Sequence, residues 1–461
     1  MIVEQLYTKC LAEAAYYIES NGEVAIIDPM RETDQYIEIA KNNGAKIKYI
    51  FETHFHADFV SGHVDLAKKT GASIVYGPTA ETGFDSIIAT DGQEFKIGAV
   101  TIRLIHTPGH TPESSTYLLI DENGNENAIF TGDTLFLGDV GRPDLAIKSD
   151  LTREDLAGML FDSLRNKLMG FADETIIYPG HGAGSSCGKN MSDETVGTLG
   201  DQKETNYALR ANMTKEEFVQ EVTTGILPPP QYFPKNAQLN KLGYESFESI
   251  LSNGNKALNI DGFISEFEKG ALILDVRHQD DFVKGFIPNS LFIGLDGTFA
   301  MWVGALIEDL DQKIILITEP GREEEAITRL ARVGYSGVLG YLNGGITSYE
   351  GELYTMDSIS PAEFEKADRE NVVDIRRTGE YSSEHLEGAE HYALDYMTSN
   401  MNHLDMKKTY HIHCAGGYRS VIAISLLMQN GYTKLINVEG GYKEISQTNI
   451  PKTEYVCPTT L

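Results

Sequence analysis

The stretch THFHADFVSGH, residues 53–63, decides how this sequence folds and what it can bind. It places His54, His56 and Asp58 at alternate positions, and imidazole and carboxylate groups in such a run are typical of a metal-binding loop. In the two-metal form of this loop, H-x-H-x-D-H, the sixth residue is histidine, whereas here it is Phe59. A phenyl ring offers no lone pair to a metal. The stretch is therefore either a decayed site or a site built for one metal.

Three further pieces of the first 200 residues supply metal-type ligands, namely His110 in TPGHT, Asp133 in TGDTL and His181 in YPGHG. Apolar runs that predict buried strands lie at 24–29, 47–54, 73–77, 100–110, 128–133 and 175–181. Each run ends in polar residues, and layered α/β folds build their sites at the ends of buried strands. A single histidine of this kind is more often structural, but six histidines and aspartates in four such places indicate a metal site.

The order of these motifs resembles the metallo-β-lactamase superfamily over residues 1 to about 200. The resemblance implies an αββα sandwich with a metal cleft at one edge. In members with two metals, the second metal would take Asp58, residue 59 and His181. Because residue 59 is phenylalanine, that second site loses a ligand while the first stays intact.

Within the superfamily, the motifs are similar to those of the persulfide dioxygenases, which hold a single iron. The resemblance implies one Fe(II) per chain, with His54, His110 and Asp133 as its ligands. Two histidines and one carboxylate leave three positions open, which is the arrangement of non-haem Fe(II) oxygenases. Zinc is redox-inactive and cannot activate O2 in this way.

The same resemblance assigns residues around the iron. Those expected to orient the ligands and handle protons are His56, Asp58 and His181. GDVGRPDL (138–145) is similar to a dioxygenase element whose arginine lies near the thiol substrate, so Arg142 is the substrate-side candidate. The alternative for Arg142 is a structural ion pair. Cys187 either touches substrate sulfur or is a small buried residue.

After a proline-rich stretch the chain repeats itself. LPPPQYFPKNAQLN (227–240) predicts neither a regular helix nor a central strand, and it reads as a boundary segment, either packed over the first domain or a plain linker. Beyond it, ILDVR (273–277) matches VVDIR (372–376), with an offset of 99 residues between the aspartates. LNGGI (342–346) likewise matches VEGGY (438–442). Two small α/β domains with short parallel sheets are therefore expected.

The second copy carries the residues of a sulfur-transfer site. TYHIHCAGGYRSVIAISLL (409–427) reads as a buried strand, a glycine-rich loop and a helix. Backbone N–H groups of such a loop lower the pKa of the cysteine, here Cys414, and make Gly416 and Gly417 the substrate-binding candidates. Arg419 adds a charge that can hold an anion such as sulfite or thiosulfate. The alternative is a buried, unreactive cysteine.

This motif resembles the rhodanese sulfurtransferases over about residues 358–455. Four residues separate the cysteine from the arginine, which favours sulfur chemistry, since cysteine phosphatases use a loop one residue longer. In the first copy, IILITEPGREEEAI (314–327), the cysteine position falls at about Thr318, although Arg322 remains. The first copy therefore resembles a catalytically silent rhodanese with a structural role.

The three parts together resemble the bacterial fusions of a persulfide dioxygenase with rhodaneses. The expected domains are 1–250, the dioxygenase; 251–355, the silent rhodanese; and 356–461, the active rhodanese. The resemblance implies oxidation of a low-molecular-weight thiol persulfide by O2 to sulfite, followed by formation of thiosulfate at Cys414. Whether glutathione, coenzyme A or another thiol carries the persulfide stays open. A homo-oligomer is expected.

Two rival functions share these motifs. One is a glyoxalase-II-like thioester hydrolase that uses zinc and a metal-bound hydroxide, which Phe59 disfavours because it removes a ligand. The other is a sulfur-carrier module in which the metal domain only binds a partner. Persulfidation of Cys414 without O2 uptake would indicate the carrier.

Composition limits the classes of function further. The chain has 461 residues, of which 41% are hydrophobic and 23% charged, as expected for a soluble protein of several domains. Its net charge of −30 argues against nucleic-acid or anionic-membrane binding. No apolar run has the length of a membrane span, and no signal peptide is expected. Four widely spaced cysteines, without a C-x-x-C pair, indicate a reducing cytoplasm.

Overall fold

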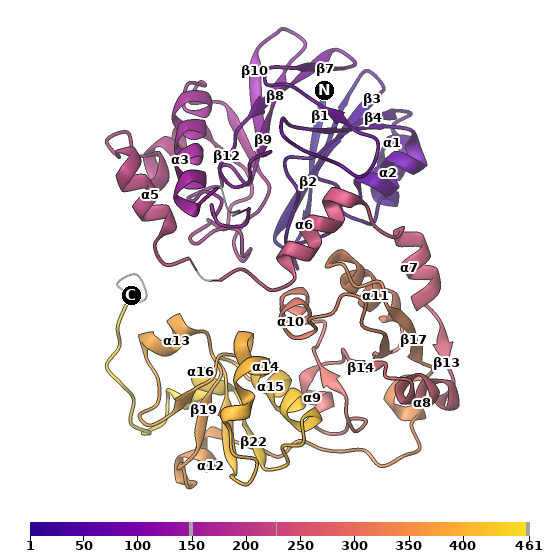
Figure 1. Ribbon diagram of the computed structural model, residues 1–461, viewed down its shortest axis with the longest axis vertical. Coiled ribbons are helices and arrows are strands. Elements are labelled where there is room, and N and C mark those ends of the chain that lie inside the picture. The colour runs from indigo at the N-terminus through magenta and orange to yellow at the C-terminus, as the bar shows by residue number, and fades with distance from the viewer. Residues whose placement is uncertain (147–150, 227, 458–461) are drawn as a thin grey trace. The chain divides into compact units, whose positions relative to one another are not determined.

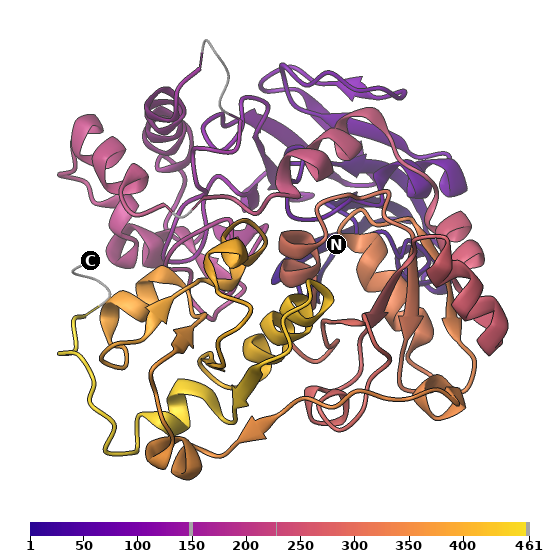
Figure 2. The same ribbon diagram turned by 60° about the horizontal axis from the view of Figure 1, so that its bottom comes forward.

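The computed structural model describes residues 1–146, 151–226 and 228–457. The chain divides into two compact units, Met1–Phe247 with Ala331–Gly334, and Glu248–Leu330 with Tyr335–Leu461 (Figures 1 and 2). Each unit is described by itself. Within the described ranges, no helix is both long and apolar enough to cross a membrane.

The first unit contains two six-stranded sheets packed face to face. The first sheet has the order β1-β2-β3-β4-β5-β6. Its strands are β1 (Ile2–Thr8), β2 (Glu13–Ser20), β3 (Glu23–Ile27), β4 (Lys46–Phe51), β5 (Ser73–Tyr76) and β6 (Ile87–Ile88). The second has the order β12-β11-β10-β9-β8-β7. Its strands are β7 (Glu94–Ile97), β8 (Val100–His106), β9 (Ser115–Ile120), β10 (Glu126–Gly132), β11 (Ile176–Pro179) and β12 (Gly197–Thr198).

Three apolar layers hold this unit together. Residues of both sheets, including Phe51 of β4 and Phe130 of β10, form the buried core between them. Helices α1 (Asp34–Asn42) and α2 (His63–Thr70) cover the outer face of the first sheet. The outer face of the second sheet is covered by α3 (Arg153–Ser163), η1 (Leu164–Leu168), α4 (Leu199–Thr205), η2 (Tyr207–Leu209) and α5 (Lys215–Thr223). The predicted αββα sandwich is confirmed.

Strand direction brings the metal-type ligands to one edge of each sheet. Strands β3 and β4 are parallel, so Asp28 and the 53–63 stretch follow neighbouring strand ends. In the second sheet β10 is parallel to β11, and β8 and β10 both run antiparallel to β9. The segments that carry His110, Asp133 and His181 therefore leave the second sheet at the same edge.

The prediction for the proline-rich stretch was wrong in its second half. Residues Phe233–Leu242 form helix α6, followed by α7 (Phe247–Gly254). Pro234 lies in the first turn of α6, where the backbone N–H that proline lacks would have no partner within the helix. A proline at that position therefore starts a helix rather than preventing one. Residue 227 lies outside the described residues.

The second unit contains two five-stranded parallel sheets with equivalent strand orders, β13-β17-β16-β14-β15 and β18-β22-β21-β19-β20. The first copy comprises β13 (Ala257–Leu258), α8 (Ile260–Glu268), β14 (Leu272–Asp275), α9 (Gln279–Phe282), β15 (Leu291–Phe292), α10 (Phe299–Leu306), β16 (Ile314–Ile317), α11 (Glu323–Arg332), β17 (Val338–Leu342) and η3 (Gly345–Ser348). The second comprises β18 (Ser358–Ile359), α12 (Pro361–Lys366), β19 (Val372–Asp374), α13 (Thr378–Ser383), β20 (Glu390–His391), η4 (Leu394–Tyr396), α14 (Met397–Asn400), η5 (Met401–His403), β21 (Tyr410–His413), α15 (Tyr418–Gln429), β22 (Leu435–Val438) and α16 (Gly441–Ile445).

The two copies share the same side-chain contact as well as the same sequence pattern. Arg277 binds Asp275 at the end of β14, and Arg376 binds Asp374 at the end of β19, each with a shortest N–O distance of 2.6 Å. Both aspartates are fully buried. Each arginine also donates to a backbone carbonyl eight residues later in the chain. The prediction of two copies of one small α/β domain is confirmed.

Candidate metal centre and cysteine site

Three side chains converge at the edge of the sandwich. Asp133 Oδ2 lies 3.8 Å from His54 Nε2 and 3.4 Å from His110 Nε2. All three residues are buried, and Asp133 Oδ2 has no hydrogen-bond partner among the described residues. Ligand atoms bound to one ion at about 2.1 Å lie roughly 3–3.5 Å apart. The three atoms therefore fit around a single divalent metal ion, and they form a His/Asp metal site typical of this fold.

A hydroxyl group fixes the orientation of His54. Thr53 Oγ1 donates to the Asp28 carboxylate at 2.8 Å, which uses its only proton. The 3.0 Å contact between Thr53 Oγ1 and His54 Nδ1 is then a hydrogen bond donated by the ring. This tautomer leaves Nε2 of His54 available to a metal, as is usual when a partner holds the other ring nitrogen.

Removing the Thr53 hydroxyl tests this orientation. We expect Thr53→Val to weaken metal binding about 10- to 100-fold, because His54 loses the partner that sets its tautomer. Thr53→Ser keeps the hydroxyl and should bind metal nearly as well as the natural protein. Competition with a chelator of known affinity measures both. Equal affinity of the valine and serine variants would show that Thr53 does not position His54.

The backbone of Arg142, in the stretch 138–145, orients His110. His110 Nδ1 donates to the carbonyl oxygen of Arg142 at 2.8 Å, which leaves Nε2 for a metal. The neighbouring Gly141 is required for this approach, because a Cβ there would lie 1.9 Å from the Asp133 carbonyl oxygen. The guanidinium of Arg142 makes a bidentate ion pair with Asp144, at 2.6 and 2.8 Å. Its role toward substrate stays a prediction.

His181 connects the metal ligand Asp133 with Asp58. Its Nδ1 lies 2.8 Å from Asp133 Oδ1, and its Nε2 lies 2.8 Å from Asp58 Oδ2. Burial alone would lower the pKa of His181, but Asp133 and Asp58 together raise it well above its usual value. A ring that donates to two carboxylates holds the Asp133 carboxylate in place. Of the three residues predicted around the ligands, His181 thus contacts the ligand Asp133 directly, and Asp58 contacts His181.

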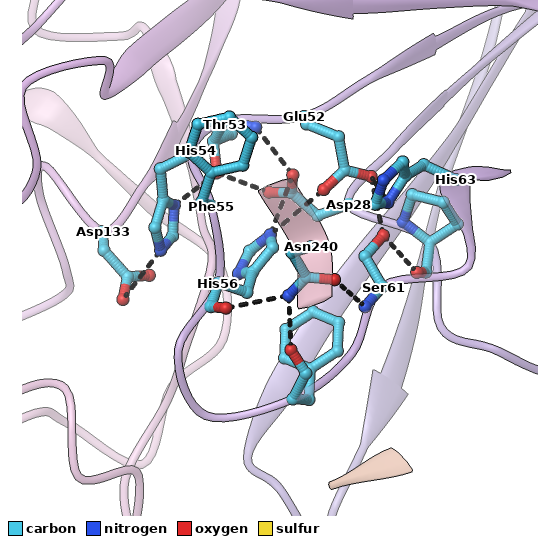
Figure 3. Close-up of polar contacts among 12 residues, drawn as sticks. Asp28, Glu52, Thr53, His54, Phe55, His56, Ser61, His63, Asp133 and Asn240 are labelled. Carbon is cyan, nitrogen blue, oxygen red and sulfur yellow. Dashed lines mark hydrogen bonds and ion pairs between the residues drawn. The ribbon is translucent and has the colours of Figure 1, made fainter. Parts of the chain in front are cut away.

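The third, His56, points elsewhere. Its ring nitrogens make no hydrogen bond within the part of the chain that the structure describes, and Nε2 faces Asp28 and Glu52 instead of the His54–His110–Asp133 group (Figure 3). Phe59 is fully buried, with its ring centroid 4.4 Å from that of His56. The last histidine of the two-metal loop is therefore replaced by Phe59, and the second, His56, is turned away from the His54–His110–Asp133 group.

Asn240 is a site residue that the sequence did not suggest. From helix α6 its side chain donates to the carbonyl oxygens of His56 and Phe59, at 2.8 and 2.7 Å. Its own oxygen accepts from the backbone N–H of Ser61 at 2.9 Å. One buried amide thereby fixes the path of the 53–63 stretch. Residues about 180 positions apart give no local pattern, so nothing in the sequence points to this contact.

Cys187 lies beside the centre. It is fully buried, and burial followed by the charges of Asp58 and Asp133 raises the pKa of its thiol well above the usual value. Its Sγ atom lies within 4.8 Å of a carboxylate oxygen of Asp58 and of a ring nitrogen of His181. The carboxylates disfavour a thiolate here, so Cys187 lacks the electropositive surroundings of a reactive cysteine.

The second site is built at the end of β21. Cys414 is almost fully buried, and the backbone N–H of Gly417 donates to its Sγ at 3.1 Å. Gly417 has φ of +96° at the start of helix α15, a conformation that glycine adopts without strain. Gly416 is exposed on the same loop. The predicted strand, glycine-rich loop and helix are all present, and the helix N-terminus faces the sulfur.

Arg419 is paired in a way that the sequence did not indicate. It makes a bidentate ion pair with Glu380, at 2.7 and 2.8 Å. Although burial alone would lower the pKa of Arg419, Glu380 raises it. The positive charge beside the cysteine is therefore compensated. We therefore expect capture of an anion at this loop to depend on backbone N–H groups such as that of Gly417 more than on a free guanidinium.

Breaking this pair should impair sulfur transfer. We expect Arg419→Gln to lower kcat/KM for sulfur transfer at least about tenfold, because Glu380 then repels an anionic acceptor from the loop. Arg419→Gln combined with Glu380→Gln should recover part of the loss, since both charges are gone. A thiosulfate–cyanide assay of the three variants checks this. A double variant no better than Arg419→Gln would contradict the electrostatic cause.

The first copy supports the loop of the second. Tyr418, at the start of α15, donates its hydroxyl to the carbonyl oxygen of Gly294 at 2.8 Å. A Cβ at Gly297 would lie 2.2 Å from the Tyr418 ring, so that ring packs directly on the Gly297 backbone. In the cysteine position the first copy has Thr318, which is buried, and Arg322 is held by Asp296, Glu319 and Glu325. The structural role of the first copy stays a prediction, which the contacts of Tyr418 support.

Known proteins share both parts of the chain. The sequence profile of the metallo-beta-lactamase superfamily matches residues 8–181, and that of the rhodanese-like domain matches residues 260–352 and 360–448. A crystal structure of a metallo-beta-lactamase from Staphylococcus aureus subsp. aureus COL is 30% identical, with a TM-score of 0.65. The match covers 74% of this chain and 98% of that one.

Two shorter relatives match the first part. The crystal structure of ETHE1 from Myxococcus xanthus is 27% identical, covers 52% of this chain and 99% of that one, and has a TM-score of 0.45. The hydroxyacylglutathione hydrolase of Brucella anthropi is 39% identical over 145 residues, which are 31% of this chain and 50% of that one.

Proposed function

Because this chain belongs to the metallo-β-lactamase superfamily and carries two rhodanese-like domains, we propose that it is a persulfide dioxygenase coupled to a sulfurtransferase. The first unit oxidises a low-molecular-weight thiol persulfide with O2, and the second makes thiosulfate from the product. Small molecules are its only partners in this reaction, apart from further copies of the chain. The observation that carries the proposal is the composition of the metal centre.

That centre has the ligand set of an iron oxygenase. His54, His110 and Asp133 converge, while His56 is turned away and residue 59 has no ligand atom. Two histidines and one carboxylate leave positions for both a persulfide sulfur and O2. The buried, unpartnered oxygen of Asp133 fits a cation such as Fe(II). Iron bound there would supply the electron exchange with O2 that zinc lacks.

The residues around the ligands orient them and manage protons. Thr53 and the Arg142 carbonyl fix the two imidazoles, and His181 holds Asp133. The reaction converts RSSH, O2 and H2O into RSH, sulfite and two protons, with four electrons passing from the outer sulfur to O2. Released protons need acceptors, and the carboxylate of Asp58, which His181 connects to the ligand Asp133, provides one at that place.

The second step uses Cys414. Its thiolate attacks the outer sulfur of a second persulfide, the S–S bond of that persulfide breaks, and the free thiol leaves. Sulfite then attacks the outer sulfur of the Cys414 persulfide, and the bond to Cys414 breaks as thiosulfate forms. The Gly417 N–H, 3.1 Å from Sγ, stabilises negative charge on the cysteine sulfur in both exchanges. No oxidant or reductant is required.

Oxygen consumption tests the proposal directly. Iron-loaded protein should consume O2 when glutathione persulfide is added, and sulfite plus thiosulfate should together match the O2 consumed. Coenzyme A persulfide, used in parallel, would distinguish the two carriers by kcat/KM. No O2 uptake with either persulfide, under conditions where iron is bound, would refute the dioxygenase.

A second candidate is a thioester hydrolase. It is favoured by the identity to the hydroxyacylglutathione hydrolase, at 39% over 145 residues. Hydrolysis would use a metal-bound hydroxide and no O2. Zinc-loaded protein that cleaves a hydroxyacylglutathione thioester faster than iron-loaded protein consumes O2 would establish this alternative. The loss of both His56 and residue 59 as ligands argues against it.

A further inference from the structure

A second group of metal-type side chains is buried behind His54. Asp28 follows β3, Glu52 and His56 follow β4, and His63 begins α2 (Figure 3). Each of the four is at most 1% exposed. The ligand atoms of Asp28, Glu52 and His56 lie within 4.8 Å of one another, and none of these residues belongs to the His54–His110–Asp133 group.

The group contains several buried polar atoms without partners. Both ring nitrogens of His56, and Glu52 Oε2, make no hydrogen bond with any residue that the structure describes. Buried polar atoms are nearly always paired, so each exception calls for a ligand or another explanation. His56 Nε2 is 3.1 Å from Asp28 Oδ1, yet the pair is not aligned as a hydrogen bond. The nitrogen instead faces the space between Asp28 and Glu52 (Figure 3).

The two carboxylates of the group face only histidines among the charged partners that the described residues supply. No lysine or arginine forms an ion pair with Asp28 or Glu52 within residues 1–146, 151–226 and 228–457. Two carboxylates in a dry interior repel each other unless a cation or protons neutralise them. One divalent ion with a neutral imidazole would make the group electrically neutral.

We propose that Asp28, Glu52 and His56 bind a second divalent cation of the zinc class, which stabilises the loop that carries His54 and takes no part in the redox reaction. His56 Nε2 is 3.1 Å from Asp28 Oδ1 and 3.7 Å from Glu52 Oε2. Atoms bound to one zinc ion at about 2.0–2.1 Å lie roughly 3.3 Å apart. One imidazole and two carboxylates are ligands that zinc accepts.

Neighbouring groups already hold the ligands in place. Asp28 accepts hydrogen bonds from the backbone N–H and the hydroxyl of Thr53, both at 2.8 Å. Glu52 Oε1 accepts from Ser61 Oγ at 2.7 Å, and His63 Nδ1 lies 3.6 Å from the same oxygen. Glu52 Oε2 is thereby left pointing to His56. Such outer partners are the usual support of a metal site.

The position of the site explains why His56 is turned away from the first centre. A ligand that holds the buried cation cannot also serve the His54–His110–Asp133 group. Because the ligands are almost fully buried, the ion would be taken up as the chain folds and would resist chelators afterwards. The inference needs only these side chains and stands whether the first centre works with iron or zinc.

Metal counting tests the proposal. The full chain, produced with iron and zinc both supplied and then dialysed against EDTA, is measured for metal ions per chain. We expect close to two ions, of which Glu52→Gln and His56→Gln each lose one and keep the ion of the first centre. Glu38→Gln, an exposed carboxylate on α1, is the matched control and should keep both. In His110→Ala the remaining ion should be the buried one.

The metal counts of the natural protein and of His110→Ala are sufficient to overturn the inference. One ion per chain, lost completely in His110→Ala, would mean that shared protons or water stabilise the buried group. X-ray absorption at the zinc edge adds a readout that does not depend on folded variants. Nitrogen and oxygen neighbours without sulfur are expected, and a zinc with sulfur neighbours would reject these ligands. A first centre filled with zinc would refute the dioxygenase but leave the count at two.

Discussion

We expect Cys414→Ser to abolish thiosulfate formation, by at least about a thousandfold, while persulfide-dependent O2 uptake continues at the rate of the natural protein. Sulfite should accumulate in place of thiosulfate. The physical reason is that only a thiolate can take up a sulfane sulfur, and a serine hydroxyl stays protonated in the same loop. The Gly417 N–H that approaches Sγ stabilises negative charge but cannot create it on serine.

Chromatography of sulfite and thiosulfate after derivatisation, with an oxygen electrode in parallel, measures both steps in one sample. Cys457→Ser, at an exposed position near the C-terminus, is the matched control and should leave both products unchanged. Thiosulfate formed by Cys414→Ser at the normal rate would mean that sulfur transfer takes place elsewhere. Loss of O2 uptake in the same variant would mean that Cys414 also takes part in the oxidation.

The other large effect is expected at the metal centre. His110→Ala should lose the metal of the first centre and with it all measurable O2 uptake, because one of three converging ligands is removed and the buried Asp133 oxygen is left with a single imidazole. Transfer of sulfur from thiosulfate to cyanide should continue, since Cys414 lies in the second compact unit and His110 in the first. Metal analysis, oxygen uptake and the cyanide assay check the three parts of this result.

The control for this variant is an exposed histidine. His403→Ala removes an imidazole that is not buried and lies in the second unit, and it should keep metal, O2 uptake and sulfur transfer. Metal retained in His110→Ala at the normal affinity would remove His110 from the ligand set. Loss of sulfur transfer as well as O2 uptake would indicate that the two units do not function independently.

Much of the fold and site could be predicted because the signals are local. Each metal-type residue lies in a segment that follows a strand in the sequence, so its place in the chain already predicted that it lies at the end of a strand. The 99-residue offset between Asp275 and Asp374 predicted two equivalent sheets for the same reason. The C-x4-R spacing predicted the loop between β21 and α15.

What could not be predicted depends on contacts between distant residues. The pairing of Arg419 with Glu380 joins positions 39 residues apart, and it changes how the loop holds an anion. The direction of the His56 ring depends on Asp28 and Glu52, which no spacing rule connects to it. Helix α6 was missed because a proline-rich stretch usually indicates that no helix is present. Pro234, however, lies in the first turn of α6, where proline is tolerated.

The contact of Asn240 with the 53–63 stretch bears on how such a catalytic module can be inherited or transplanted. The profile match of the first part ends at residue 181, yet the geometry of the metal loop is set by an amide about sixty residues further along the chain. The segment that must be inherited together is therefore longer than the segment that the family profile matches. A recombination that joined residue 181 to a foreign partner would carry every ligand across and leave behind the side chain that shapes their loop.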